Sequence, residues 1–184
     1  MKFLSILLFV FFALPAKATK SEVEAARDGA PEHISNNASV MIWKNGEYTL
    51  EVKGTNEFVC IVWADIKGTF EPSCLNQAAV EAVLPVYQFQ RHMIELGVDI
   101  NIVMDQVSLK AKSGDFPSPK PGALVYMMSE RNKYFDHYGG ELYDIEPHIM
   151  LYFPKLKESS VGFNKPGLPD LYDDFPHLSV IHLH

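Results

Sequence analysis

Two kinds of hydrophobic periodicity divide this chain into strands and helices. Residues 39–54, SVMIWKNGEYTLEVKG, contain Asn45 and Gly46, the preferred pair for a two-residue type I′ turn, and polar and apolar side chains alternate after this pair. This pattern predicts a β-hairpin with one buried face and one solvated face. Residues 57–64, EFVCIVWA, are apolar on both faces, as is typical of a central strand.

A helical period occurs in the middle of the chain. In residues 74–97 apolar side chains recur every three or four positions, and Pro85 is expected to kink or split the helix that they predict. A second apolar stripe predicts a helix from Asp99, a suitable N-cap, to Gly114. A short polar helix is expected over residues 20–29.

Three further apolar segments predict strands at 123–129, 148–154 and 178–184. The segments between them, 130–147 and 154–177, are polar, contain Gly and Pro, and predict long loops. Three strands, two helices and three more strands are typical of an α+β fold. We therefore expect a single α+β domain in which a largely antiparallel sheet of about six strands carries two main helices on one face.

Residues 1–18 have the pattern of a secretory signal peptide. A basic residue precedes an apolar run from Phe3 to Leu14, and an A-x-A cleavage signal ends at Ala18. The run is shorter than the roughly 20 apolar residues of a membrane span. We expect cleavage near Ala18, no stable membrane span afterwards, and a single domain over 19–184 that is secreted or periplasmic.

Cleavage makes the chain more acidic. Without Lys2 and Lys17 its 16 basic residues fall to 14 against 23 acidic ones, a formal net charge of −9. Because such a charge repels nucleic acid and anionic lipid, we expect no nucleic-acid partner.

The two cysteines are expected to pair. An oxidising compartment favours a disulfide between Cys60 and Cys74. Closing a loop of about 15 residues contributes about 3 kcal/mol by reducing the entropy of the unfolded chain. The spacing differs from the C-x-x-C of redox proteins, so we expect a structural role.

Histidine and methionine side chains share one face of two predicted strands. Alternation places His148 with Met150, and His182 with His184. Imidazole and thioether groups suit copper, so a copper site forms if the two strands are suitable neighbours. Methionines in strands otherwise fill cores. We therefore expect no metal, with these four residues as the copper candidates.

A serine and two histidines are candidates for nucleophilic catalysis. Ser129 ends one predicted strand, His148 begins the next, and His33 precedes the hairpin. A serine nucleophile needs a base within hydrogen-bond reach, and one edge of the sheet could bring these residues together. There is no G-x-S-x-G elbow, and the alternative is a strand-ending serine with surface histidines.

Aromatic side chains near turns favour a binding role. Trp43 stands beside the hairpin turn, and Tyr138 lies among other rings in the loop 130–147. Aromatic residues on loops are common at binding sites, although they also pack loops onto sheets. Motifs for phosphate loops, zinc sites and calcium loops are absent, so we expect no cofactor.

Several segments between about residues 25 and 155 are distinctive as a set, namely APEHISNNASVMIWKNGEY, GTNEFVCIV, EPSCLNQAA, GDFPSPKPGALVYMMS and EPHIMLYFP. Together they resemble a family of uncharacterised exported bacterial proteins with no assigned activity. The resemblance implies bacterial export and a single domain, and it implies no particular chemistry. The candidate positions within these segments are His33, Trp43, Asn56, Cys60, Cys74, Tyr126, Ser129 and His148.

These observations favour an exported, disulfide-stabilised binding or accessory domain whose ligand is a small molecule, a glycan or a protein. Its ligand-binding candidates are Trp43, Asn56, Tyr126 and Tyr138. The alternative is a small exported hydrolase that uses Ser129 and His148, and a third hypothesis is a periplasmic copper-binding protein. Whether the protein is an enzyme stays open.

Overall fold

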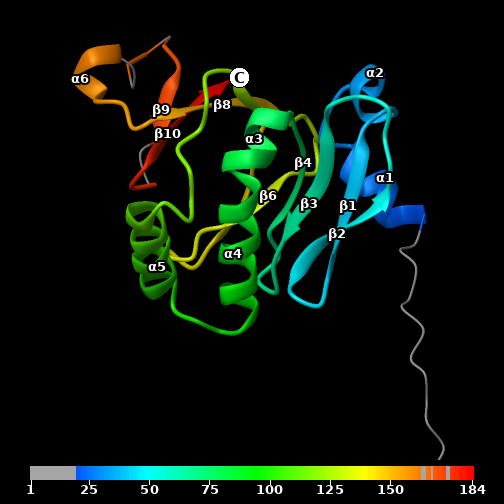
Figure 1. Ribbon diagram of the computed structural model, residues 1–184, viewed down its shortest axis with the longest axis horizontal. Coiled ribbons are helices and arrows are strands. Elements are labelled where there is room, and N and C mark those ends of the chain that lie inside the picture. The colour runs from blue at the N-terminus through cyan, green and yellow to red at the C-terminus, as the bar shows by residue number, and fades with distance from the viewer. Residues whose placement is uncertain (1–19, 163–164, 167, 173–174) are drawn as a thin grey trace, which may run out of the picture.

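The computed structural model describes residues 20–162, 165–166, 168–172 and 175–184. In these residues one twisted sheet lies between helices that cover both of its faces (Figure 1). The predicted signal peptide, residues 1–18, lies outside the described residues. Within the described ranges, no helix has both the length and the apolar character that crossing a bilayer requires.

The sheet contains ten strands in the described part of the chain, and most neighbours are antiparallel. The main path runs through β2 (Glu47–Val52), β1 (Ser39–Lys44), β3 (Val59–Ala64), β4 (Phe70–Leu75), β5 (Ala123–Met127), β8 (His148–Pro154), β10 (Leu178–Leu183) and β9 (Asp170–Tyr172). The pair β1–β3 is parallel. A hairpin of β6 (Lys133–Phe135) and β7 (Leu142–Asp144) branches from β4.

The prediction of an α+β chain with a largely antiparallel sheet is confirmed, but the prediction of about six strands is wrong. Three of the additional strands, β6, β7 and β9, have three residues each, which is too short for an alternating pattern to stand out. The fourth, β4, contains Pro72 and an acidic residue, so its sequence reads as a loop.

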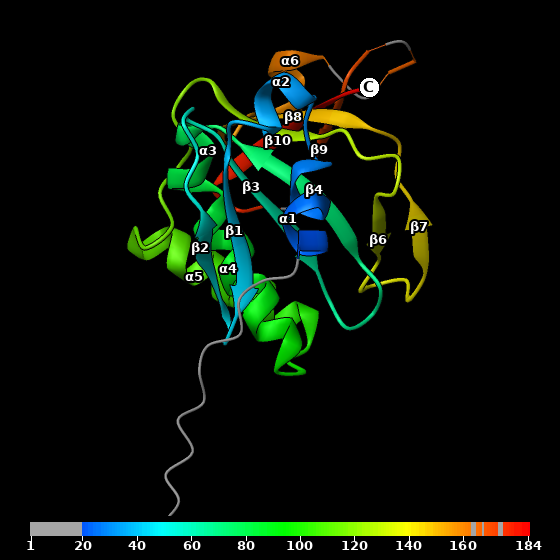
Figure 2. The ribbon, with the colours of Figure 1, turned by 90° about the vertical axis from the view of Figure 1, so that its right-hand side faces the viewer.

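Helices lie on both faces of the sheet, whereas the sequence predicted two main helices on one face. Their bounds are α1 (Lys20–Arg27), α2 (Glu32–Ser35), α3 (Gln77–Ala82), α4 (Leu84–Glu95), α5 (Ile100–Ser113) and α6 (Glu158–Val161). Helices α3, α4 and α5 share one face, and α1 packs against β1, β3 and β4 from the other (Figure 2). This second helix layer is needed because β3 is apolar on both faces.

The predicted break at Pro85 and the predicted bounds of α5 agree with the structure, whereas the helix predicted from residue 74 begins only at Gln77 because Cys74 and Leu75 belong to β4. Pro85 lies in the first turn of α4 and separates it from α3. Asp99 caps α5 by accepting a hydrogen bond from the backbone N–H of Asn101, and Gly114 ends α5 with a left-handed φ of 87°. Asn45 and Gly46 both have positive φ, as a type I′ turn requires.

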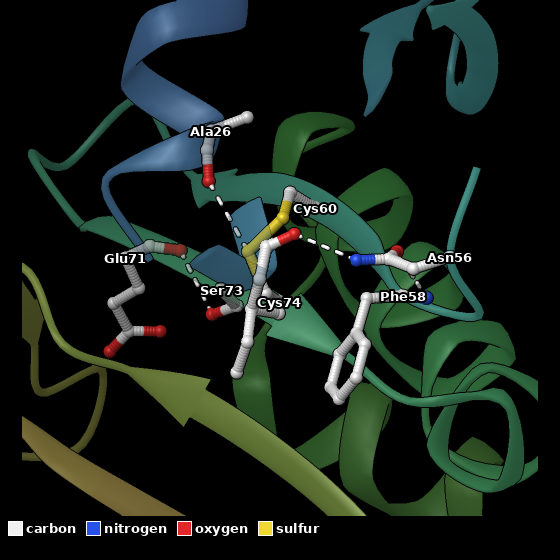
Figure 3. The surroundings of a disulfide bond; sticks show 8 residues. Ala26, Asn56, Phe58, Cys60, Glu71, Ser73 and Cys74 are labelled. Atoms are coloured by element: carbon white, nitrogen blue, oxygen red, sulfur yellow. Dashed lines mark hydrogen bonds between the residues drawn. A yellow bond between two sulfur atoms is a disulfide. The ribbon is translucent and has the colours of Figure 1, made fainter. Parts of the chain in front are cut away.

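The predicted disulfide is confirmed. Cys60 and Cys74 are directly paired across β3 and β4, and both are buried. The Sγ atom of Cys74 lies 3.8 Å from the carbonyl oxygen of Ala26 in α1 (Figure 3). The disulfide therefore ties two central strands together beneath α1, on the face opposite α4.

Candidate ligand-binding site

A cavity of about 480 Å³ lies on the face of the sheet that α4 and α5 cover. Its walls come from strands β3, β4, β5, β8 and β10, from both helices, and from the hairpin β6–β7. Most of the lining side chains are aromatic or aliphatic, and only a few polar groups point inward. This composition is typical of sites that bind small organic molecules.

Strand pairing explains which side chains meet in the cavity. Trp63 of β3 is directly opposite Glu71 of β4. In the same way Met127 is opposite His148, and His182 is opposite Met150. Because alternate residues of a strand point to the same face, all of these side chains lie on the side covered by the helices.

Glu71 has an unusual position for an acidic residue. Its carboxyl group has no hydrogen-bond partner among the described residues, and the bond that Figure 3 draws to Glu71 runs from the Ser73 hydroxyl to the backbone oxygen. Burial, and secondarily the negative charge of Asp65, raise the pKa of Glu71 to about 8. The carboxyl group is therefore mostly protonated at neutral pH.

Two tyrosine hydroxyls meet at the wall formed by α4 and β8. The hydroxyl oxygens of Tyr87 and Tyr152 are 2.5 Å apart, and the Tyr152 hydroxyl also donates to Sδ of Met150 at 3.4 Å. Burial raises the pKa of both phenols, so both stay protonated. If Tyr152 donates to Met150, then Tyr87 donates to Tyr152, and the pair holds α4 against the sheet.

Three histidines gather where β8 and β10 meet. The ring centroid of His182 lies 4.7 Å from that of His148 and 4.0 Å from that of Tyr172, in stacked geometry. His184 is 5.6 Å from His148. Burial, followed by the charges of the other two histidines, lowers the pKa of His182 to about 3, and burial also lowers the pKa of His148. Both rings are therefore neutral at pH 7.

The tautomer of His148 follows from its hydrogen bond. Nδ1 lies 2.8 Å from the carbonyl oxygen of Glu146, so a neutral ring carries its proton on Nδ1. Nε2 is then an acceptor, and it is buried with no hydrogen-bond partner in the part of the chain that the structure describes. The ring of His182 stacks on that of His148, and no group of three His, Cys, Asp or Glu side chains in the described residues has the arrangement of a metal site.

The hairpin β6–β7 forms one rim of the cavity. Tyr138 and Tyr143 line it and are 64% and 46% exposed, and Tyr172 of β9 is 43% exposed on another part of the rim. His137 is anchored here because its Nε2 lies 2.8 Å from Oδ2 of the buried Asp65. The rim therefore combines a fixed imidazole with exposed phenol rings.

The predicted catalytic residues are not joined by hydrogen bonds in the described chain. The hydroxyl of Ser129 donates to Oδ2 of Asp28 at 2.6 Å, and no hydrogen bond joins Ser129 to His148 in the described chain. His33 is exposed on α2. The hydrolase hypothesis needs contacts that this arrangement does not provide, and it stays a prediction.

The predicted ligand-binding residues fall in different places. Tyr138 lines the main cavity, but Trp43 lines a smaller pocket of about 220 Å³ and donates through Nε1 to Glu95. Asn56 holds a turn through bonds to the carbonyl oxygen of Ile34 and the backbone N–H of Phe58 (Figure 3). The Tyr126 ring packs against Phe58 on the opposite face of the sheet.

Sequence reasoning missed the polar centre of the cavity. Glu71, Trp63 and the two hydrogen-bonded tyrosines were not candidates, although the four copper candidates do line the cavity wall. The available signal was a single acidic residue inside the stretch FEPSCL, in which no other residue is charged. A charged residue among buried neighbours marks a functional position more often than a charged residue in a loop.

Any functional assignment depends on this geometry. No protein-family model, curated protein or solved structure matches the chain.

Proposed function

We propose that this protein is an exported, disulfide-stabilised binding domain that holds a small organic ligand in the cavity beside Glu71. The volume of about 480 Å³ is within the roughly 300–1,000 Å³ range of small-molecule sites. Aromatic walls would supply most of the contact area, and the few inward polar groups would orient the ligand.

One observation carries this proposal, namely a set of buried polar atoms without partners. Nε1 of Trp63 and Nε2 of His148 are buried and have no hydrogen-bond partner among the described residues. The carboxyl group of Glu71, which is only partly buried, accepts no hydrogen bond from them either. Leaving a buried donor or acceptor unpaired costs about 1–3 kcal/mol, so folded chains rarely retain such groups without a use. Two of them in one apolar cavity, beside a carboxyl group without a bond in the described residues, are best explained by a ligand that bonds to them.

The export part of the proposal is supported by the signal-like N-terminus and by the cysteine pair. A disulfide persists where thiols oxidise, and the pair Cys60–Cys74 is well placed to form one. Mass spectrometry of protein from the native cell envelope or medium should give a chain that begins after Ala18 and is two hydrogens lighter than its reduced form. An intact Met1 with two alkylatable thiols would refute export.

Binding is tested with the neutral fluorescent probe N-phenyl-1-naphthylamine. We expect saturable binding with one probe per chain and an emission increase that reports an apolar site. The Met104→Trp variant places a larger side chain in the cavity wall and should weaken binding at least tenfold.

The matched control is Ile102→Trp, which adds an indole to the same helix at an exposed position. It should bind like the wild type. Absence of saturable binding to the folded wild type, or equal effects of the two variants, would reject the cavity as the binding site.

A further inference from the structure

We propose that the ligand of this cavity is an organic cation, with an ammonium group placed between Glu71 and the ring of Trp63 and an apolar body against the remaining walls. This inference rests on the proposed binding function and adds the chemical class of the ligand. It depends on the charge, the aromatic surroundings and the strand register of Glu71.

The cavity is lined by an acidic side chain but by no lysine or arginine among the described residues. Among its lining residues in the described chain, Glu71 is the only carboxylic acid, and none is Lys or Arg. A buried carboxylate is stable only when it is paired, so an ionised Glu71 needs a positive partner that the protein does not supply here. A cationic ligand provides that partner.

The aromatic surroundings also favour a cation. The strand register places Trp63 directly opposite Glu71 on the same face of the sheet. Tyr87 and Tyr152 are near enough for the Glu71 charge to act on their phenols. Indole and phenol faces attract cations, and Arg91 lies 4.4 Å above the Trp43 ring in the same way elsewhere in this chain.

Two of the histidines that line the cavity do not oppose a cation at neutral pH. His148 and His182 are neutral because burial lowers the pKa of each ring. Asp65 adds negative potential at Glu71, and its carboxylate is bonded to His137 and Thr69. The titratable lining groups besides Glu71 are Tyr87, Tyr134, His137, Tyr138, Tyr143, His148, Tyr152, Tyr172, His182 and His184. The formal net charge of −7 also favours the approach of cations.

Binding of a cation is then coupled to loss of the Glu71 proton. Burial raises the pKa of Glu71 to about 8, so below that pH the entering cation displaces one proton from the carboxyl group to solvent. Affinity for a permanently charged ligand should therefore fall as the pH drops below 8. Affinity for a neutral ligand of the same shape should not follow this trend.

The test compares two probes of nearly identical shape, benzyltrimethylammonium and its uncharged isostere neopentylbenzene, as competitors of N-phenyl-1-naphthylamine. At pH 8 the cation should bind the wild type at least tenfold more tightly than the isostere. Between pH 8 and pH 6 the affinity for the cation should fall at least tenfold, because most Glu71 carboxyl groups are then protonated. The quaternary ammonium group cannot titrate, so the pH dependence belongs to the protein.

Two variants test whether Glu71 is the group that causes the preference for the cation. Glu71→Gln should remove the preference for the cation and its pH dependence while it keeps affinity for neopentylbenzene, which shows that the cavity is intact. Glu57→Gln removes an exposed acidic residue that precedes β3 and does not line the cavity, and it should behave like the wild type.

The outcomes separate this inference from the binding function. Equal affinity of the wild type for the two probes, or a preference that persists in Glu71→Gln, overturns the organic cation and leaves the cavity as a neutral binding site. If neither competitor displaces the fluorescent probe, the proposal of an organic cation is also wrong. Failure of the fluorescent probe itself to bind contradicts the proposed function.

Discussion

Glu71 and Trp63 face each other across β4 and β3, so a carboxyl group and an indole ring share the cavity face of the sheet. Neither the carboxyl group nor the indole N–H has a hydrogen-bond partner in the described protein. A pair of this kind costs stability when the cavity is empty, and the cost depends on pH because one partner titrates.

Stability should fall as the pH rises from 6.5 to 8, and Glu71 should be the cause. Its pKa is raised from 4.5 to about 8 in the folded chain, so over this interval the folded state holds a proton that the unfolded state has released. The free energy of unfolding then decreases by about 1.4 kcal/mol per pH unit. Urea unfolding at four pH values should show this slope in the wild type and a flatter one in Glu71→Gln. Parallel slopes would contradict the prediction.

Acid should destabilise the protein through His182, so the effect of this residue on stability changes with pH in the opposite direction to that of Glu71. The pKa of His182 is lowered from 6.5 to about 3 in the fold, so the unfolded chain gains a proton below pH 6.5 that the folded chain does not. The contribution of His182 to the free energy of unfolding is therefore fully present above pH 6.5 and is lost as the pH falls toward 3. Between pH 6.5 and 4.5 Glu71 acts in the opposite direction, which makes the wild-type curve flatter there.

The variant His182→Phe isolates this effect because its ring can still stack on Tyr172 and His148 but cannot titrate. Relative to the wild type, its stability should improve by about 1.4 kcal/mol for each pH unit below 6. The control variant His33→Phe replaces an exposed histidine of α2 that takes no part in the ring stacking around His182. Equal behaviour of the two variants would exclude His182 as the acid-sensitive group.

The tyrosine pair should show strong non-additivity. Tyr152→Phe leaves the Tyr87 hydroxyl without its partner and should cost about 1–3 kcal/mol, whereas Tyr87→Phe leaves Tyr152 bonded to Met150 and should cost less. The double variant should be less destabilised than the sum of the two single variants. Tyr126→Phe is the control, because the Tyr126 hydroxyl has no hydrogen bond in the described residues. If the losses in stability of the two single variants add up to that of the double variant, the hydrogen bond between the two hydroxyls does not contribute to stability.

The elements with strong local signals were predictable from the sequence. Asn45 and Gly46 set the hairpin turn, Pro85 separated α3 from α4, and Asp99 and Gly114 bounded α5. Each of these effects depends on a backbone property of one or two residues, so no tertiary information is needed. The disulfide was predictable because the chain contains only two cysteines.

The candidate site was only partly predictable, since it depends on which strands become neighbours. His182 and His184 were expected to share a face of one strand, and His148 a face of another, but the sequence pattern did not determine whether the two strands are neighbours. The antiparallel pairing of β8 with β10 brings the three histidines together. The position of Glu71 opposite Trp63 depends on the register of β3 and β4. Strand order and register arise from contacts distant in sequence, and local patterns do not encode them.

Ser129 should act in stability rather than in catalysis. Its side chain is 1% exposed, and its hydroxyl donates to the Asp28 carboxylate, which also receives two hydrogen bonds from Arg131. Hydrogen bonds to charged groups contribute about 1.5–3 kcal/mol when buried, but Asp28 is 41% exposed, so Ser129→Ala should cost about 1 kcal/mol. Asp28→Asn should cost a similar amount, and the double variant should cost less than the sum, as urea unfolding would measure.

The same variant separates this structural role from the hydrolase hypothesis. Hydrolysis of p-nitrophenyl acetate by the wild type and by Ser129→Ala should proceed at the same background rate, because within the described residues His148 is bonded to the backbone of Glu146 and not to Ser129. A serine nucleophile would instead give a wild-type rate that both Ser129→Ala and His148→Ala abolish while the proteins remain folded. That result would require Ser129 to leave Asp28 in the active form, and it would move the functional centre from the cavity to the end of β5.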